Sequence, residues 1–282
     1  MKKKISIIVK ENLSIIDFLK EHGYAKNKVK TYVKLGFIFV NNKKITKLPC
    51  EVKEGDTIVI DEKQITTTNF KIIYEDDNYL VVDKEAGLLT ISTSNQNKNN
   101  EITLYRLVRE YLNNKHEYAF IVNRIDKETS GLVIFVKNEQ LKERLQSNWN
   151  NIVKKRGYIA VVSGIISKSG RIENYLYEDK LTFSHSTKTG GKLAITNYKP
   201  IKTNNNYTML DINIETGRKN QIRVHMTEMH HPIVGDKKYY SKDNSLKRLA
   251  LHHYEISLID PVTNQLVTFK SNIPKEFYVL FN

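Results

Sequence analysis

Hydrophobic positions recur at helical spacing in two short segments near the start of the chain. The first runs over residues 14–22, where Ser14 is placed to cap a helix and a glycine follows the last apolar turn. The second runs over residues 26–35, where Val29 and Val33 lie four residues apart and mark one buried face. These patterns predict two short helices.

Short apolar runs follow the helices at residues 37–40 and 57–60 and predict strands, because Asn-Asn and Gly-Asp pairs typical of turns adjoin them. Together these elements predict a small module over residues 1–62. The next residues, 63–70, are polar and predict a linker. We therefore expect a second, larger domain over residues 71–282.

The larger domain alternates strand-like runs with two amphipathic segments that have helical periodicity, residues 102–115 and 138–151. The polar stretch 184–192 predicts a flexible loop. Strand-like patterns cover residues 72–84 (a strand, a turn and a strand), 131–138, 156–164, 207–215 and 253–259. Because few helices separate neighbouring strands, we expect a mixed, largely antiparallel sheet and an α+β fold class.

Positive charge exceeds negative charge along the chain. Among 282 residues, 45 lysines and arginines stand against 31 acidic residues, a formal net charge of +14, which favours a polyanionic partner such as nucleic acid. Lys26, Lys30 and Lys34 recur every four residues, so they share one helix face and repel one another by about 0.2–0.5 kcal/mol per pair. A phosphate backbone would turn this repulsion into attraction. The alternative is a solvated lysine face without a partner.

The chain has one cysteine, Cys50, which excludes an intramolecular disulfide and a site built from several thiolates. We expect a protein of the reducing cytoplasm, and no apolar run reaches the ~18 residues of a membrane span. A cluster of histidines late in the sequence lacks the HExxH spacing of zinc enzymes, so we expect no metal. The cluster comprises His225, His230, His231, His252 and His253.

The sharpest candidate for chemistry is the segment NRIDKETSGLVIFVKN, residues 123–138. Arg124 and Asp126 flank one apolar residue in an extended stretch, so both side chains point to the same side. A turn and a buried strand follow, which places a carboxylate and a guanidinium at the edge of a sheet. From the residues alone, the favoured interpretation is that Asp126 only forms an Asx turn before Gly131.

The same segment resembles the catalytic motif of the RluA/RluD-type pseudouridine synthases, which reads His-Arg-Leu-Asp followed by a Thr-Ser-Gly turn. Further segments resemble that family in its order along residues 70–280: FKIIYEDDNYLVVDKEAGLL, RGYIAVVSG, GKLAITNY, ETGRKNQIRVHM, HPIVGDKKY and LALHHYEISLIDPVTNQLVTFKSNIPKEF. The stretches KVKTYVKLGFIFVNNKKI and VKEGDTIVI in turn resemble the S4-type (alpha-L) RNA-binding domain, which is often attached to this family.

The resemblance implies the pseudouridine synthase fold and the isomerisation of a uridine within RNA, without cofactor or metal. It assigns Asp126 as the ionised carboxylate beside the ribose, either as nucleophile or as base. It assigns Arg223 as the guanidinium that keeps this carboxylate charged, and Tyr158 as the ring that stacks on the flipped base. Arg124 would hold the displaced RNA or the target phosphate. Without the family, the pattern favours a strand tyrosine for Tyr158 and an exposed helix residue for Arg223.

Four positions depart from the family pattern and bear on target choice: Asn123 and Asn220 replace histidines, Lys219 replaces a threonine, and Glu85 replaces a proline. We expect a monomer that acts on large-subunit ribosomal RNA, with transfer RNA as the alternative substrate. Two other classes stay open, a non-catalytic RNA-binding or ribosome-assembly protein and a metal-dependent hydrolase built on the histidines. The sequence retains Asp126, Tyr158 and Arg223, which argues against the non-catalytic protein. The missing metal motif argues against the hydrolase.

Overall fold

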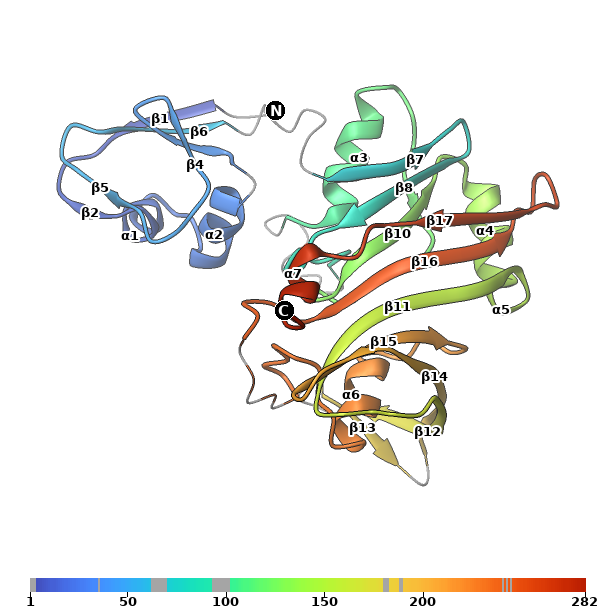
Figure 1. Cartoon of the computed structure of the whole chain (residues 1–282). Coiled ribbons are helices and arrows are strands. Elements are labelled where there is room, and N and C mark those ends of the chain that lie inside the picture. The colour runs from blue at the N-terminus through green and yellow to red at the C-terminus, as the bar shows by residue number, and fades with distance from the viewer. Residues whose placement is uncertain are drawn as a thin grey trace. The chain divides into compact units, whose positions relative to one another are not determined.

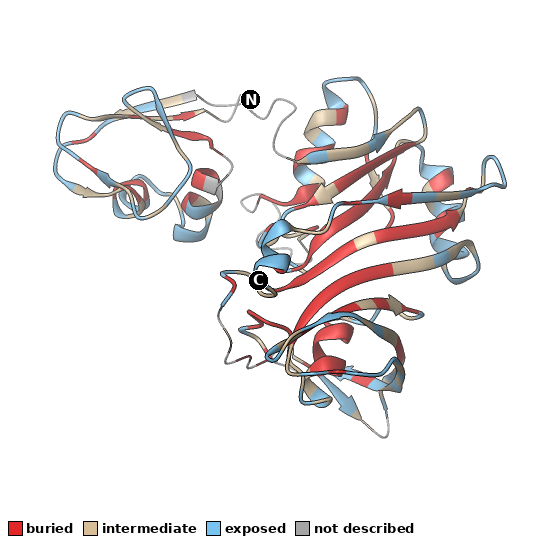
Figure 2. Cartoon of the chain, in the orientation of Figure 1, coloured by how far each residue is buried: buried red, intermediate tan, exposed pale blue. Residues whose placement is uncertain are grey.

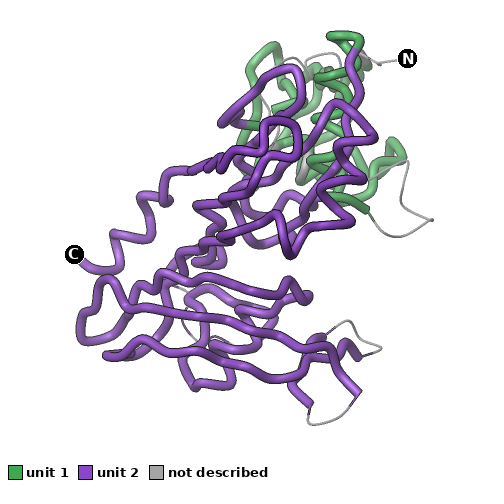
Figure 3. Tube along the Cα trace, turned by 90° about the vertical axis from the view of Figure 1, so that its right-hand side faces the viewer, with its two compact units in different colours: residues 1–70, 91–116 green, residues 71–90, 117–282 purple. Residues whose placement is uncertain are grey.

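The computed structural model groups the chain into two compact units (Figure 3). The first combines Met1–Phe70 with Ile91–His116, and the second combines Lys71–Thr90 with Glu117–Asn282. The structure describes residues 4–34, 36–61, 70–92, 102–179, 183–187, 190–239, 241, 243 and 245–282. Apart from its last residue, the predicted linker 63–70 lies outside them, so the division into 1–62 and 71–282 stays a prediction. None of the described helices is long and apolar enough to cross a bilayer.

The first unit contains helices and small antiparallel sheets, as the pattern of residues 1–62 predicts. It also contains the helix expected over residues 102–115, which the sequence pattern assigns to the larger domain. Ser14 Oγ accepts a hydrogen bond of 3.2 Å from the Asp17 amide, which confirms the helix cap. Val29 and Val33 are both buried. The helices are α1 (Ile15–Glu21), α2 (Lys26–Lys34) and α3 (Leu104–Asn113). One sheet has the order β1 (Lys4–Ile8), β6 (Thr57–Asp61), β3 (Ile38–Val40) and β4 (Lys43–Ile45), and β2 (Leu13–Ser14) pairs with β5 (Glu51–Val52).

The second unit is built on one sheet of eleven strands (Figure 1). Its main path runs β13 (Ser184–Thr187), β12 (Gly170–Glu178), β14 (Lys192–Thr203), β15 (Tyr207–Ile214), β11 (Val153–Ser163), β16 (Leu251–Ile259), β10 (Ser130–Val136), β8 (Tyr79–Lys84) and β7 (Lys71–Glu75). Two further strands, β17 (Leu266–Lys270) and β9 (Phe120–Ile121), pair with β16 and β10. Among the described pairings of this sheet only β10 with β16 is parallel, which confirms the expected mixed, largely antiparallel α+β fold.

The late strand β16 lies between β10 and β11 in the centre of this sheet. Every residue of β10 is buried, so this strand is covered on both faces. Gly131 lies where β10 meets β16, with φ of +115° and its missing Cβ position 2.2 Å from the carbonyl oxygen of His253. Only glycine fits this close approach, which explains the glycine of the Thr-Ser-Gly turn.

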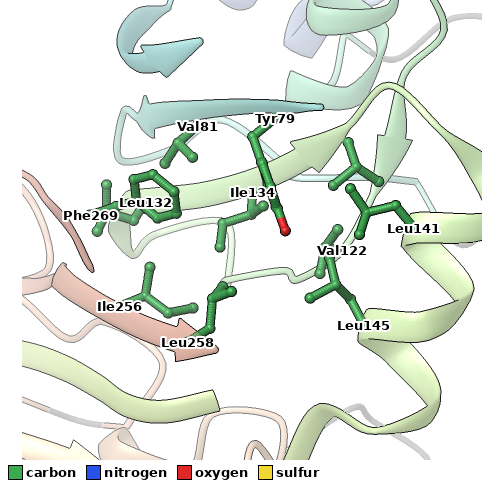
Figure 4. Packing of buried hydrophobic residues seen from close by; sticks show 11 residues of the cluster. Tyr79, Val81, Val122, Leu132, Ile134, Leu141, Leu145, Ile256, Leu258 and Phe269 are labelled. Atoms are coloured by element: carbon green, nitrogen blue, oxygen red, sulfur yellow. The ribbon is translucent and has the colours of Figure 1, made fainter. Parts of the chain in front are cut away.

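Helices cover the sheet of the second unit at two places. Helices α4 (Glu139–Ser147) and α5 (Trp149–Ile152) pack against strands β8, β10 and β16, and their contact forms an apolar cluster (Figure 4). Helix α6 (Gln221–Glu228) packs through Val224 against β12 and β14. The short helix α7 (Lys275–Val279) follows β17. Buried residues concentrate in the central strands, which gives a rigid support for the loops at their ends (Figure 2).

The expectation of a flexible loop over residues 184–192 is wrong for its first part, which forms strand β13. This strand pairs with β12 at the edge of the sheet, and Ser184 is buried with its amide bonded to the Tyr239 hydroxyl at 2.9 Å. An edge strand buries few side chains, so its sequence stays polar and lacks a strand-like apolar pattern.

Candidate active site

A pocket of about 80 Å³ in the second unit lies between the turn after β9, strand β11 and the start of α6. It brings together the four residues that the sequence selects in the larger domain. The pocket is lined by Arg124, Ile125, Asp126, Thr129, Tyr158, Ile214, Gly217, Arg218, Asn220, Gln221, Ile222, Arg223 and Leu251. These residues lie far apart in the sequence, so the site exists only in the folded chain.

The turn that carries Asp126 is fixed on both sides by hydrogen bonds to its backbone. Thr90 Oγ1 donates to the carbonyl of Ile125 at 2.6 Å. The fully buried ammonium of Lys84 donates to the carbonyl of Lys127 at 3.0 Å, and to two carbonyls of its own loop. Three carbonyl acceptors compensate for burying this charge, and the residue before and the residue after Asp126 are both held.

Burial dominates the electrostatics of Asp126. Removal from water raises the pKa of its carboxyl group, and the positive charges of Arg223 and then Arg124 and Lys238 oppose that rise. Within the part of the chain that the structure describes, no donor forms a hydrogen bond to this carboxylate. The group is thus an acceptor whose hydrogen-bonding capacity is unused, at the wall of a pocket.

Arg223 is held by a carboxylate other than the expected one. Its Nε and Nη2 atoms donate to the two carboxylate oxygens of Asp236 at 2.8 and 2.7 Å, and its Nη1 donates to Asn220 Oδ1 at 3.0 Å. The Arg223 residue is 4% exposed, so the interpretation of it as a surface helix residue is wrong. Asp236, in the segment HPIVGDKKY, was not selected from the sequence. The signal that could have found it is that a buried guanidinium requires a buried carboxylate.

Tyr158 lies on β11, is 8% exposed and lines the pocket. Its ring stacks on the ring of His253, with 4.4 Å between centroids and an interplanar angle of 16°. Burial raises the pKa of the phenol above its usual value, although the guanidinium of Arg156 opposes this. The hydroxyl group is therefore protonated at neutral pH and available as a donor.

The four departures from the family pattern make different kinds of contact. Asn123 accepts a hydrogen bond of 2.7 Å from the Ile134 amide and so ties the catalytic segment to β10. Asn220 adopts a left-handed conformation, with φ of 55°, at the start of α6. Lys219 pairs with Glu178 on β12. Glu85 is exposed, and its carbonyl accepts from the buried lysine described above.

The buried histidines serve as hydrogen-bonding residues in this fold. His225 contacts Thr196 at 2.9 Å and Asn174 at 2.8 Å, and burial lowers its pKa to about 4. Burial likewise lowers the pKa values of His252 and His253, to about 3 and about 4. Among the described residues no group of three or more His, Cys, Asp or Glu side chains is arranged to hold a metal ion.

On helix α2 of the first unit, the side chains of Lys26 and Lys30 are exposed. The side chain of Lys34 lies outside the described residues, so the third member of the expected lysine face is not placed.

Comparison with known proteins identifies the family. Residues 78–228 match the model of the RNA pseudouridylate synthases. The chain is 30% identical to ribosomal large subunit pseudouridine synthase D of Haemophilus influenzae, over 92% of this chain and 86% of that protein. It is 36% identical to the protein of the same name from Borreliella burgdorferi, over 75% of this chain and 67% of the relative.

The fold agrees with these matches. The structure of human RNA pseudouridylate synthase domain containing 4 superposes with a TM-score of 0.60 and 18% identity, covering 73% of this chain and 90% of that one. A second human structure, RNA pseudouridylate synthase domain containing 1, gives the same TM-score and identity, covering 76% of this chain and 86% of that one. The chain thus belongs to the RNA pseudouridylate synthase family and is a pseudouridine synthase, an isomerase that acts on RNA.

Proposed function

We propose that this enzyme converts uridines of large-subunit ribosomal RNA to pseudouridine, and that Asp126 is the group that acts at the ribose. The observation that carries the role of Asp126 is its position: a carboxylate without a hydrogen-bond donor, among the described residues, at the wall of a pocket shared with Tyr158 and Arg223. The ribosomal target is supported by relatives named ribosomal large subunit pseudouridine synthases.

The reaction breaks the bond between C1′ of the ribose and N1 of uracil and forms a bond between C1′ and C5. The proton on C5 leaves, N1 gains a proton, and nothing is oxidised or reduced. Asp126 acts in its ionised form, whether it attacks C1′ or removes a ribose proton. Because burial raises the pKa of this group, the nearby guanidinium of Arg223 supports the charged form at neutral pH.

Tyr158 and Arg124 divide the remaining work in this proposal. The buried ring of Tyr158 lines the pocket and offers a stacking surface for the flipped uracil, and in this proposal its hydroxyl group helps to remove the C5 proton. Arg124 is exposed at the rim of the same pocket, where a guanidinium suits a phosphate of the displaced strand.

The first unit would add affinity for RNA as an S4-type domain, with Lys26 and Lys30 binding phosphates together with Lys34. Lysine lacks the forked donors that read base edges, so this binding is expected to be independent of sequence. Replacing the three lysines with glutamine should reduce the log–log salt slope of RNA binding by up to ~0.7–0.9 for each phosphate that the protein no longer neutralises. An unchanged slope would mean that these lysines are only solvated and do not bind phosphates.

The test of the active site uses Asp126→Asn and tritium release from RNA labelled at C5 of uracil. Activity should be lost while RNA binding is kept, because only the reacting group changes. Asp77→Asn is the control, since Asp77 is exposed in the turn between β7 and β8. Activity of Asp126→Asn within a few-fold of wild type would overturn its assignment. Mapping pseudouridines in total RNA with and without the gene tests the target, and sites lost only from transfer RNA would overturn the ribosomal proposal.

A further inference from the structure

His253 lies directly beneath the tyrosine of the pocket. Tyr158 and His253 are paired across strands β11 and β16, just after a register shift between Gly157 and Tyr158. Their rings are nearly parallel, with 4.4 Å between centroids, so the histidine covers one face of the tyrosine. His253 is 1% exposed and does not line the pocket, whereas Tyr158 does. His253 therefore covers one face of the tyrosine ring, and only the rest of the ring is open to the pocket.

The imidazole of His253 is itself fixed by β10. Its Nδ1 lies 2.9 Å from the carbonyl oxygen of Leu132, so Nδ1 carries the proton and donates. Nε2 is buried and has no hydrogen-bond partner among the described residues. The backbone of His253 also lies against Gly131 of β10. The ring thus has one orientation, set by the strand that follows the catalytic turn.

A neutral imidazole suits this place. Burial lowers the pKa of His253 to about 4, so the ring carries no charge at neutral pH. The nearby guanidinium of Arg156 acts in the same direction. A flat, neutral ring supports a phenol by stacking, and a stacked aromatic pair contributes beyond its buried area.

We infer that His253 is a positioning residue: it holds the plane of Tyr158 so that the target uracil stacks on the ring in the orientation the isomerisation needs. This inference rests on the proposed role of Tyr158. The tyrosine reaches the substrate, and the histidine acts through the tyrosine. The alternative is that His253 only satisfies the Leu132 carbonyl in the core.

Two substitutions separate the two roles of the imidazole. His253→Phe keeps a flat ring beneath Tyr158 but loses the donor to Leu132. His253→Asn keeps a donor near the position of Nδ1 but loses the stacking ring. We expect kcat/KM in tritium release to fall about tenfold in the Asn variant and to stay within about threefold of wild type in the Phe variant. Equal losses in the two variants, or an Asn variant as active as wild type, would overturn the inference.

Stability is measured on the same samples by thermal unfolding. Tyr79→Phe serves as a control, because it removes a buried hydrogen bond of 2.6 Å to Asp260 elsewhere in the sheet. It should lower Tm and leave kcat/KM unchanged. Asp126→Asn is assayed in parallel: if it stays active, the proposed function fails, whatever His253 does.

If His253→Phe does not fold, a second measurement on the Asn variant tests the inference. In the Asn variant the ring-proton resonances of Tyr158, assigned by their loss in Tyr158→Phe, should move because the ring current beneath them is gone. Unmoved resonances would show that the imidazole does not set the environment of this tyrosine and would overturn the inference.

Discussion

Asp236→Asn is expected to weaken the fold and at the same time to make Asp126 easier to ionise. The side chains of Arg223 and Asp236 are 5% and 1% exposed, so they form a buried ion pair. A surface pair, in contrast, contributes only about 0–1 kcal/mol to stability. Removing one partner of a buried pair costs about 3–5 kcal/mol. The amide keeps an oxygen for the backbone amides of Lys238 and Tyr239, at 3.0 and 3.1 Å, so we expect the lower end.

A loss of about 3 kcal/mol corresponds to a fall in Tm of about 6–12 °C for a domain of this size. The effect on the pH profile follows from charge. Among the positive charges near Asp126, that of Arg223 lowers its pKa the most. The negative charge of Asp236 offsets part of this effect, because Asp236 is paired with Arg223. Asp236→Asn should therefore lower the pKa of Asp126, whereas Arg223→Met should raise it further. Activity needs the ionised carboxylate, which is present above this pKa and lost as pH falls through it.

The assay is kcat/KM for tritium release between about pH 4.5 and 8, because this ratio reports ionisations of the free enzyme. The acid limb should move to lower pH in Asp236→Asn and toward neutral pH in Arg223→Met. Asp260→Asn, at a buried aspartate bonded to Tyr79, should lower Tm without moving the limb. Limbs that move in the same direction in the two site variants would refute the electrostatic reasoning.

Three further outcomes are expected. Gly131→Ala should lower both Tm and activity sharply, because the new methyl group would lie 2.2 Å from the carbonyl oxygen of His253; a variant as stable as wild type would contradict the close approach. Lys84→Met should lower the free energy of unfolding in urea by about 3 kcal/mol and lower kcat, because three carbonyls, including that of Lys127, lose the charged donor that they share. An unchanged kcat would mean that the turn keeps its conformation without the ammonium group. Turnover should survive EDTA when the RNA stays folded, and activity restored only by zinc or manganese would favour a metal-dependent mechanism.

The elements of this fold are local in sequence and were predictable for that reason. The helix cap at Ser14, the buried stripe of Val29 and Val33, and the strand–turn–strand over residues 72–84 each depend on neighbours within a few residues. The strand order was not predictable, because an apolar strand has the same pattern whichever strand it joins. Strand β13 could not be predicted, because a polar edge strand lacks the apolar pattern of a strand.

The site shows the same division. Asp126, Tyr158 and Arg223 could be chosen from motifs, and the structure brings them to one pocket. Asp236 was missed because its pairing with the arginine depends on where the loop after α6 returns. His253 was considered only as a possible metal ligand, since stacking beneath Tyr158 depends on a register shift between β11 and β16 that no sequence pattern announces.

The central place of β16 has a consequence for synthesis on the ribosome. Strands β10 and β11 are complete by residue 163, but the strand that joins them begins at residue 251. At a translation rate of about 5–20 residues per second, the edge of β11 that later pairs with β16 waits for several seconds without its partner strand. Such edges invite wrong pairing and aggregation, so the nascent chain is a natural client for chaperones during this interval. The interval also means that Tyr158 meets His253 only near the end of synthesis, and that no nascent chain that ends before residue 251 carries the complete lining of the pocket.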